Sequence, residues 1–284
     1  MLNAAAASTN RKAILKSTAQ ETQKAIPTVL HLRPDAPPTG YQCLPSRYTP
    51  LSSRFFPTLS TEVRVVDADT YDTAIQITNA YASSGVDTTP VCVLNMASEK
   101  NPGGGWLTGA MAQEEALCYR STLSATLKRR FYPLKEREAI YSPKVVIFRE
   151  SYDNNHRMMD LQRPDFLPAV SVISAAALRR PAVNTRTVPA RYVYPEDRLL
   201  MKDKMRVILR VAARNRHRSL VLGALGCGVF ANPSHDVADC WREVLQEQEF
   251  RGWWDNITFA VLKDVSHGTD NFEVFHTKLH GLRV

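Results

Sequence analysis

The sequence lacks several features that would assign it to particular classes of protein. No apolar run approaches the ~20 residues that a membrane-spanning helix needs, so we expect no membrane partner. The five cysteines among 284 residues are scattered and form no CxxC pair, which argues against a disulfide framework and a cysteine metal site. This cysteine usage is typical of a reducing compartment. We also find no internal repeat and no low-complexity segment.

Charge is unbalanced in one direction, because 36 basic residues face 28 acidic residues and give a net charge of +8. Such a charge is common on soluble proteins, and it also suits a polyanionic partner. The sequence has neither a nucleic-acid recognition motif nor aromatic residues interleaved with basic ones, so direct nucleic-acid binding is not expected. The basic run at residues 128–130 and the pair Arg179 and Arg180 are expected to be solvated surface, with a track for a polyanionic polymer as the alternative.

No metal or cofactor is expected either. The seven histidines are not accompanied by cysteines at metal-binding spacing. Ser98 and Ser234 lack the GxSxG turn that presents a nucleophilic serine in many hydrolases.

The N-terminus allows two interpretations. Residues 1–20 contain no acidic residue and include Arg11, Lys12 and Lys16, which is compatible with a mitochondrial transit peptide. Residues 11–24 also scan as an ordinary amphipathic helix. We favour the structural helix.

The rest of the chain alternates between strands and helices. The predicted strands are Val63–Asp67, Val91–Asn95, Lys144–Arg149, Ala169–Ala175, Leu220–Gly223 and Ile257–Leu262. Helices are predicted over Arg11–Lys24, over Asp72–Ser84, where Gly85 ends the helix, and over Met111 to about Lys128. Three more helices are predicted to begin at Glu196, after a capping Asn232 and at a capping Asp270. Residues 27–60 and 176–196 are predicted to be long connections.

The most informative stretch lies between the predicted strand Val91–Asn95 and the helix that follows it. Three adjacent glycines, Gly103 to Gly105, are followed seven residues later by Gln113, Glu114 and Glu115. Consecutive glycines let a backbone approach an anion and point several N–H groups into one concavity. Carboxylates beside such a cradle would repel phosphate. They are better placed to contact sugar hydroxyls or a bond to be cleaved.

A second loop of similar character follows the predicted strand Leu220–Gly223. It contains Gly226, Gly228, Val229 and Phe230 and precedes another predicted helix. A plain turn with one exposed aromatic residue is the alternative. Because ligands of open α/β sheets bind outside the carboxyl ends of the strands, we expect the two loops to face one crevice.

The combination GGG-x7-QEE resembles the signature of the microbial-type (bacterial and fungal) poly(ADP-ribose) glycohydrolases of the macrodomain superfamily. Residues 94–98, Asn101 with Pro102, and the second loop at 221–233 fit the same family. The resemblance implies a macrodomain-like three-layer α/β/α fold with a mixed, largely parallel sheet and an N-terminal helical extension. We therefore expect a helix and wrapping extension over residues 1–60 and the catalytic domain over 61–284.

The resemblance also implies roles for individual residues. Glu115 is the catalytic acid and Glu114 the second catalytic residue, which holds the ribose. Phe230 packs on that ribose, and Gly104 and Gly105 give the diphosphate access to backbone N–H groups. Asp69, after the first strand, is a candidate for reading the adenine amino group, with a helix N-cap as the alternative. The candidate substrate-binding residues are Asn101, Gly103, Gly104, Gly105, Gln113, Gly226, Gly228, Val229, Phe230 and Asp69.

The chemistry follows from the spacing of the two glutamates. Neighbours on a helix diverge by about 100°, so Glu114 and Glu115 cannot flank one bond from opposite sides as in ordinary two-carboxylate glycosidases. One acid with a ribose-holding partner fits better. Glu115, with a pKa raised by partial burial, would protonate the leaving ribose hydroxyl and then activate water. The diphosphate would stabilise the oxocarbenium-like state.

The resemblance therefore implies a glycosidase that hydrolyses ribose–ribose bonds of poly(ADP-ribose), mainly from the chain end, and releases ADP-ribose. It would reverse ADP-ribosylation of proteins, as in the DNA damage response, and we expect a monomer in the nucleus or cytoplasm. A macrodomain that only binds ADP-ribose is the alternative, although such a module has no need of Glu114 and Glu115. A nucleic-acid-binding protein is supported only by the positive charge.

Overall fold

The computed structural model describes residues 2–52, 57–84, 89–263 and 270–284. Its strands are β1 (Tyr41–Cys43), β2 (Arg64–Val66), β3 (Cys92–Met96), β4 (Ala139–Val146), β5 (Ala169–Ala175), β6 (Val183–Asn184), β7 (Arg191–Tyr192), β8 (Ser219–Leu222) and β9 (Asn256–Ala260). Seven of them form one sheet in the order β1-β4-β5-β3-β8-β9-β2. The strands from β5 to β2 are parallel to one another, whereas β4 is antiparallel to both β1 and β5. The sheet is thus mixed and largely parallel, as predicted.

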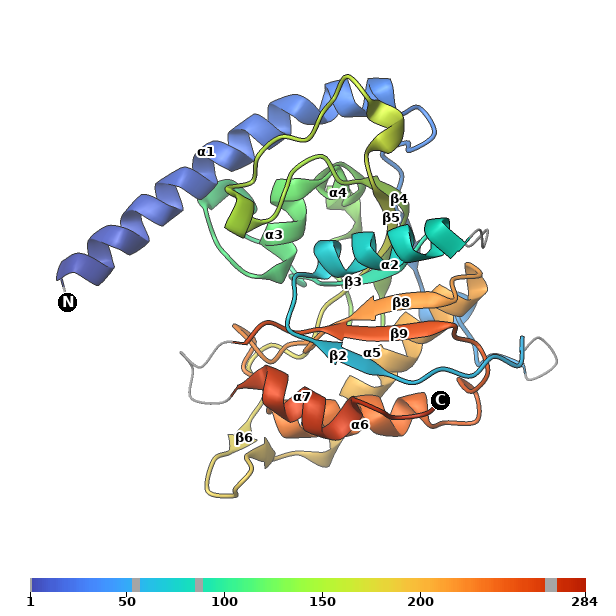
Figure 1. Ribbon diagram of the computed structural model, residues 1–284. Helices are drawn as coiled ribbons and strands as arrows, with labels where there is room; N and C mark the ends of the chain where they lie inside the picture. Colours follow the sequence, from blue (N-terminus) through green and yellow to red (C-terminus); the bar gives the residue numbers. More distant parts are fainter. Residues whose placement is uncertain (1, 53–56, 85–88, 264–269) are drawn as a thin grey trace.

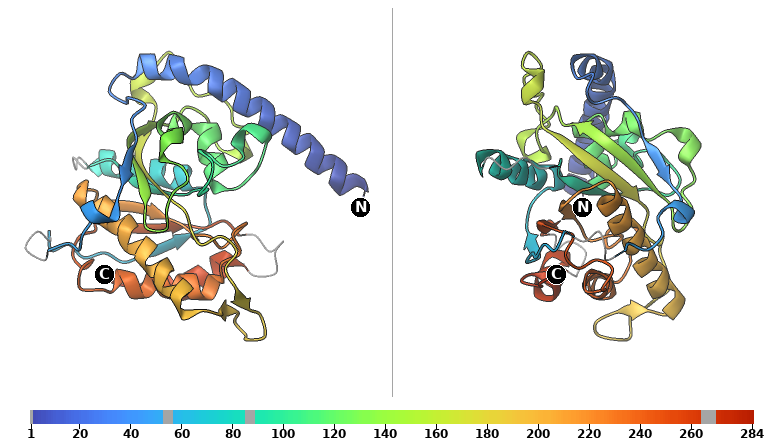
Figure 2. Two further views of the ribbon diagram at one scale, coloured as in Figure 1. Left: turned by 180° about the vertical axis from the view of Figure 1, so that it is seen from behind. Right: turned by 90° about the vertical axis from the view of Figure 1, so that its right-hand side faces the viewer.

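Helices cover both faces of this sheet (Figure 1; Figure 2). One layer contains α1 (Leu2–Leu32), α2 (Thr70–Ser84), α3 (Gln113–Arg120) and α4 (Leu123–Thr126), and the other contains α5 (Pro195–Arg214), α6 (Ser234–Leu245) and α7 (Asn271–Leu279). Strand β3 shows why two layers are needed. Its side chains alternate, so Cys92 and Leu94 pack in the core beneath α5–α7 while Val93 packs in the core beneath α1–α4. Burial on both faces explains why β3 is apolar from Cys92 to Leu94.

The N-terminal region is more closely integrated with the sheet than the sequence suggested. Helix α1 ends at Leu32 and so continues past Pro27, where a long connection was predicted. Proline removes one helical hydrogen bond, but Ile26 and Val29 on either side of it are buried in a small core with Phe148. After α1, strand β1 pairs with β4 at the edge of the sheet. Residues 1–60 therefore supply a helix and a strand to the same three-layer fold.

Three further predicted segments differ in the structure. Of the strand predicted over Lys144–Arg149, only residues 144–146 lie in β4, which begins at Ala139 and has a register shift between Ser142 and Val145. The helix predicted from Met111 is interrupted at Ser121, where the backbone is extended and forms a bridge to Ile147. The predicted connection at 176–196 contains the hairpin of β6 and β7. In the first two cases pairing with strands or residues distant in sequence overrides the local pattern.

Two of the remaining helices, α5 and α6, were predicted with the correct buried faces. Met201, Met205, Ile208 and Ala212 of α5 and Val237, Trp241 and Val244 of α6 are all buried. Asp270 caps α7 by accepting a hydrogen bond from the Phe272 N–H at 2.9 Å. The cap predicted at Asn232 is wrong, because Pro233 occupies the N-cap position of α6 and Asn232 bonds to neighbouring loops instead. Gly85, the predicted end of α2, lies outside the described residues.

Among the helices in the described ranges, none combines the length and apolar character required to cross a bilayer.

Candidate active site

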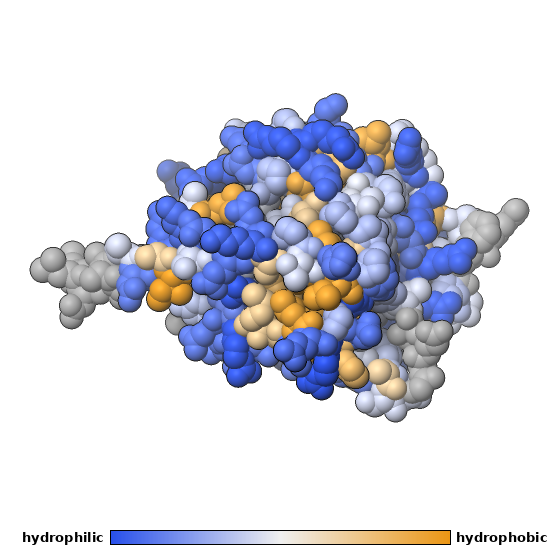
Figure 3. All heavy atoms as spheres, turned by 90° about the horizontal axis from the view of Figure 1, so that it is seen from above, coloured by the Kyte–Doolittle hydropathy of each residue, from blue (hydrophilic) through white to orange (hydrophobic). Residues whose placement is uncertain are grey.

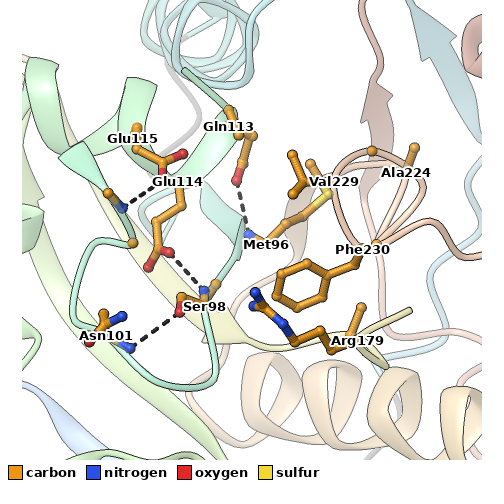
Figure 4. Close-up of a pocket in the computed structure, with 17 residues that line it drawn as sticks. Met96, Ser98, Asn101, Gln113, Glu114, Glu115, Arg179, Ala224, Val229 and Phe230 are labelled. Atoms are coloured by element: carbon orange, nitrogen blue, oxygen red, sulfur yellow. Dashed lines mark hydrogen bonds between the residues drawn. The ribbon is translucent and has the colours of Figure 1, made fainter. Parts of the chain in front are cut away.

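A cavity of about 350 Å³ opens at the carboxyl ends of β3, β5 and β8 (Figure 4). This volume lies in the range typical of small-molecule sites. Both glycine loops line it, so the prediction that they face one crevice is confirmed. The predicted site residues in its wall are Asn101, Gly104, Gly105, Gln113, Glu114, Glu115, Gly226, Gly228, Val229 and Phe230. Gly103 and Asp69 are not part of the wall.

The glycine loop after β3 is shaped around the two glutamates. Gly104 has φ of +59°, a conformation that side chains rarely adopt. A Cβ atom added there would collide with the Glu115 Oε1 and would lie 2.9 Å from the Glu114 Oε2. A glycine is therefore needed at this position because the carboxyl groups pack directly against its backbone.

The amides of this loop are engaged within the protein. The Gly105 N–H donates to the Glu115 Oε1 at 2.8 Å, and the Gly104 N–H donates to the Asn101 carbonyl at 3.0 Å. The backbone of Gly103 also bonds to the Glu114 carboxyl. This arrangement differs from the predicted one, in which Gly104 and Gly105 present free N–H groups to a diphosphate. The groups that the loop amides hold here are the carboxyl groups of the two glutamates.

Glu114 is almost fully buried, with 3% of its surface exposed. Its Oε2 accepts a hydrogen bond from the Ser98 N–H at 2.7 Å, and its Oε1 accepts one from the Asn95 Nδ2 at 3.3 Å. Burial raises the pKa of Glu114 to about 8, and these hydrogen bonds oppose the rise. The carboxyl therefore retains a proton at neutral pH. The sequence interpretation predicted a raised pKa for Glu115, the residue that the resemblance makes the acid. The structure gives a raised pKa to its neighbour Glu114.

Gln113 and Glu115 are fixed by the start of α3. The Gln113 Oε1 accepts from the Met96 N–H at 2.9 Å, while its Nε2 donates to the Leu94 carbonyl at 2.7 Å and to the Thr70 Oγ1 at 3.2 Å. These bonds tie the first turn of α3 to β3 and α2. The turn therefore places the carboxyl of Glu115, which is 8% exposed, against the glycine loop.

The second loop presents amides that are free of protein partners. Within the described residues, the N–H groups of Gly228, Val229 and Phe230 donate to no acceptor. Gly228 and Val229 are exposed at the cavity. Successive N–H groups of this kind form an anion-binding concavity.

The second loop is held in shape by Asn232. The Asn232 Nδ2 donates to the carbonyls of Leu178 at 2.7 Å and Gly226 at 3.1 Å, and its Oδ1 accepts from the Tyr192 hydroxyl at 2.9 Å. Gly226 has φ of +78°, and a Cβ there would collide with Ala177 and Asn232. Asn232 therefore joins the loop after β5 to the loop after β8, which is a role the sequence did not reveal.

Phe230 lies across the cavity from Glu114, and its ring is half-buried (Figure 4). The Arg179 guanidinium lies over this ring, with its Cζ 5.2 Å from the ring centroid. Arg179 lines the cavity although it was expected to be solvated surface. Its position four residues after the end of β5, at the carboxyl edge of the sheet, is the signal that could have identified it.

Asp69 and Asn101 lie at the edges of the site. The Asp69 Oδ1 accepts from the N–H groups of Tyr71 at 2.7 Å and Asp72 at 3.1 Å, so Asp69 caps α2, and it also pairs with the buried Arg120. The structure thus confirms the alternative interpretation of Asp69 as a helix cap, while adenine recognition stays a prediction. Asn101 is exposed at the rim, where its Oδ1 accepts from the Arg129 Nη1 at 3.3 Å.

Two histidines have a spacing that the sequence interpretation overlooked. His276 lies on α7 and His280 is the C-cap residue of this helix, four residues later; their rings stack with centroids 4.4 Å apart. The Nδ1 of His280 accepts a hydrogen bond from the Val65 N–H at 3.2 Å, which gives the pair a structural role. Over the part of the chain that the structure describes, no group of three potential ligands could hold a metal.

The comparisons with known proteins agree on one family. The model of the family described as microbial-type PARG, catalytic domain, matches residues 10–150, which include the glycine loop and both glutamates. A comparison with curated protein sequences gives no match.

Solved structures resemble most of the chain. The poly(ADP-ribose) glycohydrolase of Thermomonospora curvata is 26% identical over 93% of this chain and 98% of its own, with a TM-score of 0.78. A mutant of the Deinococcus radiodurans enzyme, in complex with ADP-ribose, is 29% identical over 84% of this chain and 94% of its own, with a TM-score of 0.69. Another structure of the D. radiodurans enzyme with ADP-ribose is 30% identical over 78% and 84%, with a TM-score of 0.62. Together with the predicted signature, these matches show that the chain belongs to the family of microbial-type poly(ADP-ribose) glycohydrolases.

Proposed function

We propose that the protein is a glycosidase that hydrolyses the ribose–ribose O-glycosidic bonds of poly(ADP-ribose) and releases ADP-ribose. The observation that carries this proposal is the pair Glu114 and Glu115, held by a glycine loop in a cavity whose opposite wall carries Phe230 and three free amides. Related enzymes from D. radiodurans were solved with ADP-ribose, and the one from T. curvata was solved with the inhibitor ADP-HPD. Binding of ADP-ribose in this cavity is consistent with both.

The two walls suit different parts of the substrate. The amides of residues 228–230 suit the diphosphate of the terminal unit, because they offer donors without an opposing carboxylate. Phe230 packs on the terminal ribose and places its anomeric carbon towards Glu114 and Glu115. This orientation supports cleavage mainly from the chain end.

The two glutamates divide the chemistry. Burial keeps the Glu114 carboxyl neutral, so it holds a ribose hydroxyl by hydrogen bonding. Glu115 transfers its proton to the leaving ribose oxygen, which keeps the electron pair of the broken bond. Water then attacks the oxocarbenium-like carbon and gives a proton to the Glu115 carboxylate, which restores the acid.

One assay tests the proposal. Purified poly(ADP-ribose) is incubated with the protein, and free ADP-ribose is measured by chromatography. Release of ADP-ribose supports a glycohydrolase. Binding of ADP-ribose without release would identify a macrodomain that only reads the modification. Monomeric state and a nuclear or cytoplasmic location stay predictions.

A further inference from the structure

Arg179 is the only cationic residue among the described residues that line the cavity. The proposed reaction does not use it. Each repeat of the proposed substrate carries two negatively charged phosphates, and the two glutamates of the cavity offer them no cationic partner. We propose that Arg179 binds a phosphate of the substrate and thereby sets the affinity of the cavity for the diphosphate. This inference rests on the proposed function for the identity of the ligand.

The backbone on both sides of Arg179 is bonded to the second glycine loop. Before it, the Leu178 carbonyl accepts from the Asn232 Nδ2 at 2.7 Å. After it, the Arg180 N–H donates to the Phe230 carbonyl at 2.8 Å. Arg179 is therefore presented at a fixed place beside the three free amides. Such preorganisation reduces the entropy lost on binding.

The side chain is available for a ligand although it has partners. Its Nη1 lies 3.4 Å from the Glu99 Oε1, and 51% of its side chain is exposed. A long, exposed ion pair of this kind contributes little stability. A phosphate accepts two parallel hydrogen bonds from a guanidinium and can replace Glu99. Figure 4 shows the guanidinium beside the Phe230 ring, on the same side of the cavity as the second loop.

The phosphate could come from either of two units of the polymer. If it belongs to the terminal unit, free ADP-ribose contains it. If it belongs to the next unit, only polymer contains it. Titration with ADP-ribose and the KM for polymer therefore distinguish the two sources.

The test compares three substitutions. Arg179→Met keeps the apolar contact with Phe230 and removes the charge, and Arg179→Lys keeps the charge without the planar guanidinium. Arg180→Met is the matched control, since Arg180 is also exposed but does not line the cavity. Affinity for ADP-ribose is measured by calorimetry at low and high salt, and KM is measured with polymer.

We expect Arg179→Met to weaken the binding of ADP-ribose, or to raise the KM for polymer alone, by about tenfold, as for a lost hydrogen bond to a charged group. The variant should also lose part of the salt dependence, which a purely structural role would not change. Arg179→Lys should recover part of the affinity and Arg180→Met should match the wild type. Unchanged affinity, KM and salt dependence in Arg179→Met would overturn the inference. If Arg179→Met weakens the binding of ADP-ribose but the wild-type protein releases no ADP-ribose from polymer, the proposed function alone is refuted.

Discussion

The two glycine loops resemble each other in sequence and differ in what their amides do. In the loop after β3, the Gly105 amide binds the Glu115 carboxylate and the Gly104 amide binds a carbonyl of the same loop. In the loop after β8, the amides of Gly228, Val229 and Phe230 have no acceptor among the described residues. The first loop positions the acids of the protein, and the second is free to receive the anion of a substrate.

The difference teaches that a glycine-rich cradle does not by itself identify a phosphate site. Gly104 is enclosed by the two carboxyl groups, whereas a Cβ at Gly228 would meet no atom within 4 Å. Both loops satisfy the same local rule, that glycine admits close approach of an anion. Both loops are followed by a helix with acidic residues in its first turn, and the direction of these side chains makes the difference. Glu115 of α3 accepts from the Gly105 amide of its loop, whereas Asp236 of α6 accepts from Arg191.

The largest effect should come from the acid held by the first loop. Glu115→Gln keeps the shape of the side chain and removes its proton, so turnover of polymer should fall by about 10²–10⁴-fold while ADP-ribose still binds. Release of ADP-ribose and calorimetry measure the two quantities. Glu136→Gln, at an exposed carboxylate that does not line the cavity, is the control. Turnover close to wild type would remove Glu115 from the role of acid.

The burial of Glu114, the neighbour of Glu115, should make the stability of the protein depend on pH. The pKa of Glu114 is raised from 4.5 to about 8 in the folded protein. The folded state therefore binds the proton more tightly, and the free energy of unfolding should fall as pH rises from about 4.5 to 8, by a few kcal/mol at ~1.36 kcal/mol per pKa unit. Urea unfolding at several pH values measures this, and Glu114→Gln should flatten the dependence. An equal slope in the variant would show that another group is responsible.

Removal of the aromatic residue on the second loop should affect catalysis more than binding. Phe230→Ala leaves the terminal ribose poorly placed, and a displacement of about 1 Å can cost ~10²-fold in rate. Steady-state kinetics should show this loss in kcat, with a smaller change in the affinity for ADP-ribose. Phe166→Ala, at an exposed ring, is the control. A normal rate for Phe230→Ala would mean that the two loops do not bind the same substrate molecule.

The smallest effect is expected when one methyl group is added to a glycine of each loop. This change also compares the two loops most directly. Gly104→Ala should lower the free energy of unfolding by about 1–3 kcal/mol, because a left-handed residue is strained and the methyl group meets both carboxyl groups. Gly228→Ala should change it by less than about 0.5 kcal/mol, as at other open positions. Equal values from urea unfolding would contradict the different environments of the two loops.

The sequence by itself determined the elements that carry the site. The alternation of strand, glycine loop and helix predicted the layered sheet, because buried parallel strands and amphipathic helices have distinct patterns. Since parallel strands end at one edge, this order also predicted that the residues around Gly104 and Gly228 would line one cavity.

Only the tertiary structure decided how these residues are used. Pairing of β1 with β4 and packing around Pro27 bring the N-terminal region into the fold, since contacts distant in sequence outweigh local signals. Asn232 satisfies carbonyls on two loops instead of capping a helix, and Arg179 becomes part of the cavity through those bonds. The raised pKa falls on Glu114 because desolvation depends on the depth to which packing buries each carboxyl group, which neighbouring positions in a sequence do not reveal.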